Sequence, residues 1–158
     1  MTDLDGLVHE LMARPDDWAH LVAHDPGQRR YELLRRDDEV EVWLICWMAD
    51  HDTGFHDHDL SSGAVGVVAG AVREDRLVLG GGTVSREVAA GGTFTFTAAD
   101  IHRVLHAGAE PAVTIHAYSP PLWRMGAYEV AETGELRRHS VSYAEELRPL
   151  TSGAPSAS

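Results

Sequence analysis

The sequence predicts an all-β fold, an antiparallel barrel or jelly roll preceded by a short helical segment. Two observations support this fold class. From residue 31 onward, short apolar runs are separated by turns rich in Gly, Asp and Pro. These runs recur at intervals of roughly 10–15 residues without a helical pattern between them, which favours a closed antiparallel sheet over a parallel α/β sheet. The 158 residues fit a single domain.

The segment 1–27 is expected to be helical and to pack on the barrel. Pro15 cannot continue a helix that begins before it, so two short helices that break there are predicted. Asp16 is then a candidate N-cap of the second helix. The apolar side chains of the segment recur with a helical period, at Leu4, Leu7, Val8, Leu11, Trp18, Leu21 and Val22.

The barrel itself is assigned to residues 28–149. The residues of 150–158 are small and polar and bury too little apolar surface to become ordered, so a disordered tail is predicted. Strands are expected where apolar, β-branched and aromatic residues cluster between turn residues, at 31–34, 40–47, 64–68, 76–79, 93–96 and 112–118.

Charge and composition exclude several kinds of partner. The formal net charge is −12 and the thirteen basic residues are all arginines scattered among acids, which disfavours nucleic acid. No run approaches the roughly 18 apolar residues of a membrane span. The acidic start at Met1 does not resemble a signal peptide, so a cytoplasmic protein is expected. The single cysteine, Cys46, cannot form an internal disulfide. No obligate protein partner is evident.

Three histidines form a candidate metal site. His56 and His58 are an i, i+2 pair, which on an extended strand points both imidazoles to the same side. His102, after the turn at Gly91 and Gly92, offers a third nitrogen from another strand. Imidazole ligands suit iron, copper, nickel or zinc, so the ligand set alone leaves the metal open. Three protein ligands leave coordination positions for small molecules.

The spacing around these histidines is similar to that of the two motifs of the cupin barrels. Gly70 stands where the first motif has its final glycine, and Gly91 falls at the start of the second motif. Gly63 occupies the position at which the first motif usually has a glutamate ligand. The resemblance therefore implies a cupin jelly roll whose metal is held by three histidines and no carboxylate.

More specifically, the chain resembles the cysteine dioxygenase family of thiol dioxygenases across residues 28–130. In that family a serine, a histidine and a tyrosine form a hydrogen-bonded relay beside the iron, and Thr114, His116 and Tyr118 occupy these positions. Alternation along one strand sends the three side chains to one face. The resemblance lies in four segments: VWLICW (42–47), GFHDHDLS (54–61), IHRV (101–104) and EPAVTIHAYSPP (110–121).

The family resemblance implies a mechanism. An iron(II) ion held by the three histidines would bind a small thiol and dioxygen, and both oxygen atoms would be transferred to sulfur to give the sulfinic acid. Tyr118, oriented by His116, would donate a hydrogen bond to the oxygen or to the substrate. In animal members this tyrosine is crosslinked to a cysteine at the position of Gly63, so no such crosslink can form here.

The substrate contacts are expected on an early strand. Family members that accept cysteine bind its carboxylate through an arginine there, and counting back from residues 37–38 places Tyr31 at this position, with Arg29 and Arg30 just before it. Arg124, after the relay strand, is another candidate for the anion contact. Cysteine or a cysteine-like thiol is the first expectation, while 3-mercaptopropionate or a bulkier thiol such as a thiolated histidine stays open.

Two other classes of cupin remain as alternatives. One is a dioxygenase whose substrate has no thiol, and the other is a protein that only binds a small ligand. The relay favours the thiol dioxygenase, because a passive binder has no need of an oriented phenol beside its metal. His106, four residues after His102, is expected to be structural rather than a ligand.

Overall fold

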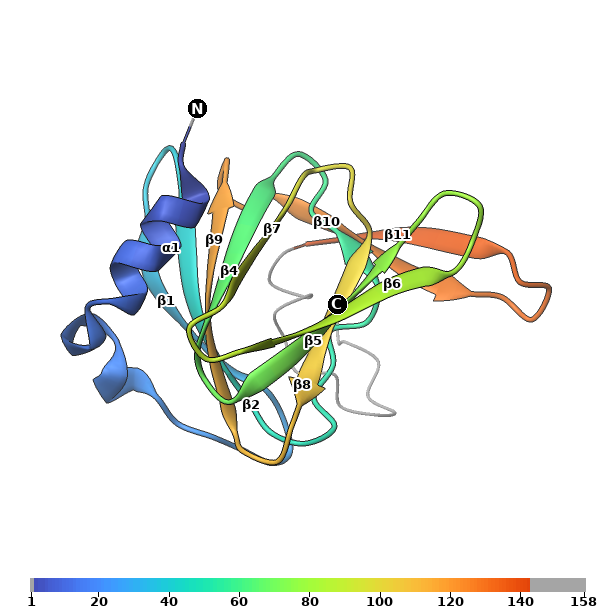
Figure 1. Ribbon diagram of the computed structural model, residues 1–158. Helices are drawn as coiled ribbons and strands as arrows, with labels where there is room; N and C mark the ends of the chain where they lie inside the picture. The colour runs from blue at the N-terminus through green and yellow to red at the C-terminus, as the bar shows by residue number, and fades with distance from the viewer. Residues whose placement is uncertain (1, 143–158) are drawn as a thin grey trace.

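The computed structural model describes residues 2–142, which form two antiparallel β-sheets packed face to face, with helical turns on one side (Figure 1). The predicted all-β fold class is confirmed. The predicted tail at 150–158 lies outside the described residues. The strands are β1 Arg30–Arg36, β2 Glu41–Trp47, β3 His56–Asp57, β4 Ser62–Ala69, β5 Ala71–Leu77, β6 Thr83–Ala89, β7 Thr93–Phe96, β8 His102–Ala107, β9 Ala112–Ser119, β10 Arg124–Val130 and β11 Leu136–Ser142.

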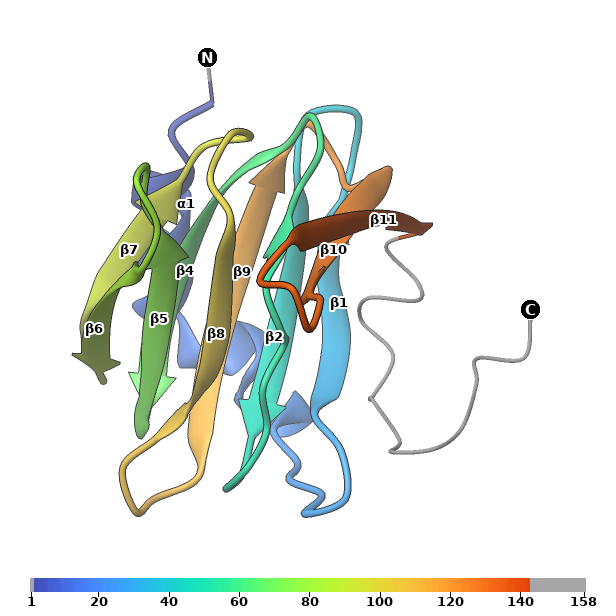
Figure 2. The ribbon, with the colours of Figure 1, turned by 90° about the vertical axis from the view of Figure 1, so that its right-hand side faces the viewer.

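The two sheets have the strand orders β1-β2-β9-β4-β7 and β11-β10-β3-β8-β5-β6 (Figure 2). The chain crosses from one sheet to the other between β4 and β5, at Gly70. This residue has a φ of 67°, and a Cβ on it would lie 2.5 Å from the carbonyl oxygen of Pro111. A residue without a side chain is therefore required at the crossing.

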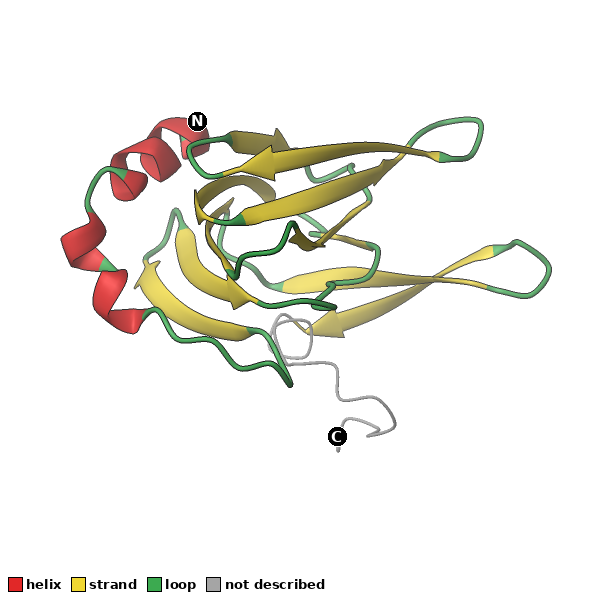
Figure 3. Ribbon diagram, turned by 60° about the horizontal axis from the view of Figure 1, so that its bottom comes forward, coloured by secondary structure: helices red, strands yellow, loops and turns green. Residues whose placement is uncertain are grey.

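The N-terminal segment packs on the outer face of the five-stranded sheet, and Figure 3 shows the helical turns together on that side. The helix α1, Leu4–Met12, begins at Asp3, whose side chain accepts a backbone hydrogen bond of the first turn. Two 3-10 turns follow, Pro15–Asp17 and Ala19–Leu21, in place of a second α-helix. The predicted N-cap is corrected, because Asp16 lies inside the first of these turns.

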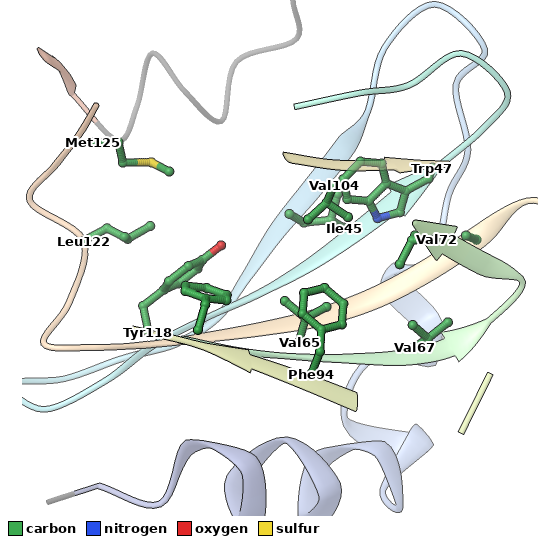
Figure 4. Packing of buried hydrophobic residues seen from close by; sticks show 12 residues of the cluster. Ile45, Trp47, Val65, Val67, Val72, Phe94, Val104, Tyr118, Leu122 and Met125 are labelled. Atoms are coloured by element: carbon green, nitrogen blue, oxygen red, sulfur yellow. The ribbon is translucent and has the colours of Figure 1, made fainter. Parts of the chain in front are cut away.

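Apolar side chains form one cluster on each face of the five-stranded sheet. The inner cluster lies between the two sheets and contains Trp47, Val65 and Tyr118, with the Tyr118 hydroxyl directed into the interior (Figure 4). The outer cluster lies against α1 and contains Val8 and Ile115. Because β2 and β9 are covered on both faces, nearly all of their residues are buried. Double burial explains the continuous apolar run of β2 in the sequence.

Several strands differ from the sequence prediction for physical reasons. The strand β6 is at a sheet edge and almost wholly exposed, so its sequence has no apolar pattern to recognise. The strands β10 and β11 are likewise absent from the predicted set. The strand β5 begins at Ala71, well before the predicted 76–79, because its inward positions include the charged Glu74. No helix within residues 2–142 is long and apolar enough to cross a membrane.

Candidate metal centre

The structure brings the three predicted histidines together between the sheets. His56 on β3 pairs directly with His102 on β8, and His58 is the first residue after β3. Ring centroids are 4.7 Å apart for His56 and His58, and 4.8 Å apart for His56 and His102. All three are buried, and one nitrogen from each lies within 4.8 Å of the others. Within residues 2–142, this is the single group of three or more His, Cys, Asp or Glu side chains that could hold a metal ion.

The hydrogen bonds of the outer ring nitrogens show which nitrogens face the centre. Nδ1 of His102 lies 2.6 Å from Glu74, and Nδ1 of His56 lies 2.9 Å from the carbonyl oxygen of Gly54. The Nε2 atoms of His56 and His58 are 3.1 Å apart. Nε2 of His102 is buried without a hydrogen-bond partner among the described residues. The Nε2 atoms therefore converge, and a metal ion between them would satisfy Nε2 of His102.

The protonation of the cluster suits a cation. Burial lowers the pKa of His58 well below its ordinary value, and the neighbouring His56, His102 and His116 lower it further. A neutral imidazole is the form that binds a metal through its lone pair. A divalent transition metal thus fits the site, with His56, His58 and His102 as the residues that could hold it.

Phe96 fills the place at which a cupin glutamate would stand. A Cβ built on Gly63 would collide with the Phe96 ring, and this ring stacks on His58 with centroids 4.3 Å apart and an angle of 24° between planes. A side chain at position 63 would therefore displace the ring that supports His58. Packing of Phe96 against Gly63 therefore leaves no room for a carboxylate beside the three histidine nitrogens.

The three residues of the predicted relay lie in hydrogen-bonded series on β9. Oγ1 of Thr114 lies 2.6 Å from Nε2 of His116, and Nδ1 of His116 lies 3.3 Å from the Tyr118 hydroxyl. All three side chains are buried. The Tyr118 ring lies 5.3 Å from the His58 ring, centroid to centroid, so the relay ends beside the histidine cluster.

Trp47 extends the relay by one member that the sequence did not predict. Its indole Nε1 donates a hydrogen bond of 2.8 Å to Oγ1 of Thr114. An indole nitrogen can only donate. Of the described residues, Trp47 and His116 are the two hydrogen-bond partners of the Thr114 hydroxyl. Since Thr114 accepts from Trp47, its own hydrogen finds an acceptor only at Nε2 of His116.

This pattern assigns the tautomer of His116. With Nε2 accepting from Thr114, the ring hydrogen of a neutral His116 is on Nδ1 and is donated to the Tyr118 oxygen. Burial, helped by the positive charge of Arg29, lowers the pKa of His116 to about 3, so the ring is neutral at ordinary pH. Tyr118 accepts from His116 and therefore directs its own hydrogen elsewhere.

A narrow cavity of about 20 Å³ adjoins the cluster. This is little more than the roughly 10–15 Å³ that one water molecule requires. The three histidines, His116 and Tyr118 line it, together with one guanidinium, that of Arg29, and the apolar side chains of Ile45, Val65, Phe96, Val104 and Met125. None of the described residues that line it is an aspartate or a glutamate.

The residues predicted as substrate contacts, Arg30, Tyr31 and Arg124, are not among those that line this cavity. Arg29 is the arginine among its described lining residues. Tyr31 lies two residues after Arg29 and so on the same face of the extended chain, but its ring packs edge-on against that of Trp43, with centroids 5.8 Å apart. Arg30 and Arg124 are exposed. Arg29 lies one residue before β1, outside the strand on which the contact was expected.

Two buried carboxylates support the cluster from behind. Glu74 is buried, which opposes its ionisation, but hydrogen bonds with His102 and Arg76 lower its pKa to about 2. Asp57, between His56 and His58 in the sequence, points to the opposite side and accepts hydrogen bonds from Arg138 at 2.9 Å and from the Tyr128 hydroxyl at 2.5 Å. Partial burial opposes ionisation of Asp57 too, but these bonds lower its pKa to about 2.

His106, which was expected to be structural, is outside the histidine cluster. Its Nε2 lies 2.7 Å from the carbonyl oxygen of Glu110, at the turn between β8 and β9. Cys46 is buried in the outer apolar cluster, and burial raises the pKa of its thiol. Neither residue lines the cavity.

Comparison with solved structures supports the fold. TT1209 from Thermus thermophilus has a TM-score of 0.59 at 17% identity, covering 66% of this chain and 95% of that one. A protein with a double-stranded β-helix domain from Klebsiella pneumoniae has a TM-score of 0.56 at 12% identity, covering 76% of this chain and 91% of that one. At these identities the likeness concerns the cupin fold alone.

Comparison of sequences identifies the family. Human cysteine dioxygenase type 1 is 22% identical over 168 aligned residues, which cover 99% of this chain and 82% of the human protein. A family model described as cysteine dioxygenase type I matches residues 3–131. The family and the three-histidine cluster together indicate a metal-dependent dioxygenase. By a match over most of its length, the chain belongs to the cysteine dioxygenase type I family.

Proposed function

We propose that this protein is an iron(II)-dependent thiol dioxygenase that converts a small thiol and one dioxygen molecule to the sulfinic acid. The observation that carries the proposal is the hydrogen-bonded series from Trp47 through Thr114 and His116 to Tyr118, which ends beside the histidine cluster. A cupin that only stores or senses a ligand has no use for a phenol oriented in this way.

His56, His58 and His102 are the proposed iron ligands. When bound there, iron(II) would supply the electron transfer between thiol and dioxygen that no amino-acid side chain can provide. Three neutral nitrogens leave the positive charge of the ion uncompensated at the cavity, which favours a thiol in its deprotonated form. The apolar cavity walls exclude bulk water from the reacting groups.

Tyr118 is the proposed hydrogen-bond donor to the reacting groups. His116 donates to the phenol oxygen, and the phenol hydrogen is proposed to be donated to the substrate or to the oxygen atoms that add to its sulfur. Thr114 and Trp47 keep His116 in the tautomer that permits this. The relay thus orients one proton at the Tyr118 oxygen rather than moving charge along the strand.

Arg29 is the proposed contact for a carboxylate on the substrate, in place of Tyr31, Arg30 or Arg124. Its guanidinium lines the cavity, and a planar fork of donors suits a carboxylate. Without an aspartate or glutamate among the described lining residues, the cavity itself makes no ion pair with an ammonium group. Cysteine and 3-mercaptopropionate are therefore both substrate candidates, and a thiolated histidine remains an alternative.

The proposed setting is the cytoplasm. The lone, buried Cys46 means that the fold needs no disulfide, and a reducing compartment keeps both thiols and iron(II) in the reduced state.

Oxygen uptake over a panel of thiols tests the proposed function. The protein is loaded anaerobically with iron(II) and mixed with cysteine, 3-mercaptopropionate, cysteamine and a thiolated histidine, and both oxygen consumption and sulfinate are measured. One sulfinate per oxygen molecule is expected for a small thiol carboxylate. No thiol-dependent oxygen uptake with any member, or uptake without sulfinate, would exclude the proposal.

A matched pair of variants tests the ligands. His102→Ala is expected to abolish iron retention, whereas His106→Ala, four residues along the same strand and outside the cluster, should retain the metal. Equal loss in both variants would mean that the third ligand is assigned wrongly.

A further inference from the structure

A buried carboxylate lies directly behind one histidine of the cluster. Glu74 on β5 is 2% exposed, and its Oε2 atom lies 2.6 Å from Nδ1 of His102. The ladder between β5 and β8 pairs Arg76 with His102 and Glu74 with Val104, so Glu74 and His102 both face the interior. The carboxylate therefore approaches the ring from the side opposite to the converging Nε2 atoms.

Two arginines hold the carboxylate in this position. Arg76 donates to Oε2 at 2.8 Å, and Arg86, on the edge strand β6, donates to Oε1 at 3.1 Å. Each oxygen thus has its own arginine, and Oε2 also accepts from His102. This sharing fixes the plane of the carboxylate and with it the direction of its bond to the ring.

The outer nitrogens of the other two histidines have different surroundings. Nδ1 of His56 faces the carbonyl oxygen of Gly54 at 2.9 Å, and Nδ1 of His58 is buried without a hydrogen-bond partner in the described chain. The outer nitrogen of His102, by contrast, meets a carboxylate.

We propose that Glu74 is a positioning residue of the metal site: it accepts the Nδ1 hydrogen of His102 and fixes the ring with its Nε2 lone pair toward the metal. The proposal rests on the proposed function only in requiring that the cluster binds a divalent metal. A carboxylate behind a ligand histidine strengthens its donation and sets its tautomer.

Glu74→Gln tests the role, because the side chain keeps its shape and loses its charge. Cobalt(II) and iron(II) affinities are measured anaerobically by competition with a chelator, and the visible spectrum of the cobalt form reports the ligand field. We expect affinity to fall by about 10- to 100-fold, with a shifted cobalt spectrum. An unchanged affinity and spectrum would overturn the proposal.

Asp75→Asn is the matched control. Asp75 is the next residue of β5, is equally buried at 2% exposure, and is also held by two arginines, Arg73 and Arg103, but on the face away from His102. This variant should lose stability without losing metal affinity. A similar fall in affinity for both variants would reduce Glu74 to a general structural role and so contradict the proposal.

A second variant keeps the test decisive where Glu74→Gln does not fold. Arg86 is half exposed, and Arg86→Gln loosens the carboxylate without removing it. A smaller fall in cobalt affinity, still several-fold, is expected, and no fall would count against the proposal. Wild-type protein that binds cobalt but shows no thiol-dependent oxygen uptake would refute the proposed function and leave the role of Glu74 intact.

Discussion

The guanidinium of Arg29 lies over the indole of Trp47, 5.5 Å from the ring centroid. The residue proposed to bind the substrate carboxylate thus rests on the residue that begins the relay. The cation is attracted by the electron-rich face of the ring, while the edge of the same ring donates to Thr114. Trp47 therefore contacts both the proposed carboxylate-binding residue and the relay.

Arg29→Gln should weaken the use of thiols that carry a carboxylate. Loss of a charge-assisted hydrogen bond predicts a fall of about 10- to 100-fold in kcat/KM, mainly through KM, for cysteine and 3-mercaptopropionate. Cysteamine, which has no carboxylate, should be affected little. Steady-state oxygen uptake measures the difference. Arg30→Gln is the control, since Arg30 is exposed and does not line the cavity; equal effects of the two variants would disprove the assignment.

Trp47→Phe should slow turnover without weakening metal binding. The change keeps an aromatic ring and removes the donor that orients the Thr114 hydroxyl, so His116 is no longer restricted to one tautomer. A fall of about 2- to 10-fold in kcat is expected, in line with one hydrogen bond. Trp43→Phe is the control, because the buried Trp43 nitrogen has no hydrogen-bond partner in residues 2–142. Comparable losses of kcat in both would argue against a relay that begins at Trp47.

Gly63→Ala should destabilise the protein through Phe96. The added methyl group would displace the Phe96 ring from its stack on His58, at a cost of about 1–3 kcal/mol in the free energy of unfolding. In a Phe96→Leu background the smaller side chain leaves room, so the same substitution should cost less. Urea unfolding of the four proteins gives the coupling. Purely additive effects would show that the ring does not occupy the space at position 63.

The stability of the metal-free protein should fall as the pH is lowered from 7 to 5. An unfolded histidine binds a proton near pH 6.5, whereas buried His116 does so only near pH 3. Between these values the unfolded state holds more protons, so acid favours it, by at most about 1.4 kcal/mol per pH unit for one group. Urea unfolding at several pH values measures the slope.

His116→Gln should reduce the slope of the unfolding free energy against pH by the contribution of one histidine, whatever its effect on stability at pH 7. His20→Gln, which removes a histidine from an exposed position, is the control for the loss of an imidazole. A slope that is the same in the wild type and in His116→Gln would mean that the buried ring does not contribute to the pH dependence.

The residues that could be predicted from the sequence are those whose geometry is local. Alternation along one strand is enough to place Thr114, His116 and Tyr118 on one face. The same rule places His56 and His58 on one side of an extended chain. His102 is found from its position in the second cupin motif.

The supporting residues could not be predicted, because they depend on which strands become neighbours. Trp47 meets Thr114 through the ladder between β2 and β9, and Glu74 meets His102 through the ladder between β5 and β8. Arg29 was missed for another reason, since it lies one residue before β1, outside the strand on which the contact was expected. Composition alone gives no sign of any of these contacts.

The bond between Asp57 and Arg138 links the proposed metal site to the last described strand. The strand β3, which carries His56, has two residues and pairs with β8 and β10. Asp57 is tied to β11 across a separation of 81 residues, so β3 depends on the hairpin of β10 and β11 as well as on β8. A change that loosens this hairpin would therefore reach two of the three proposed ligands, although it lies far from them in the sequence.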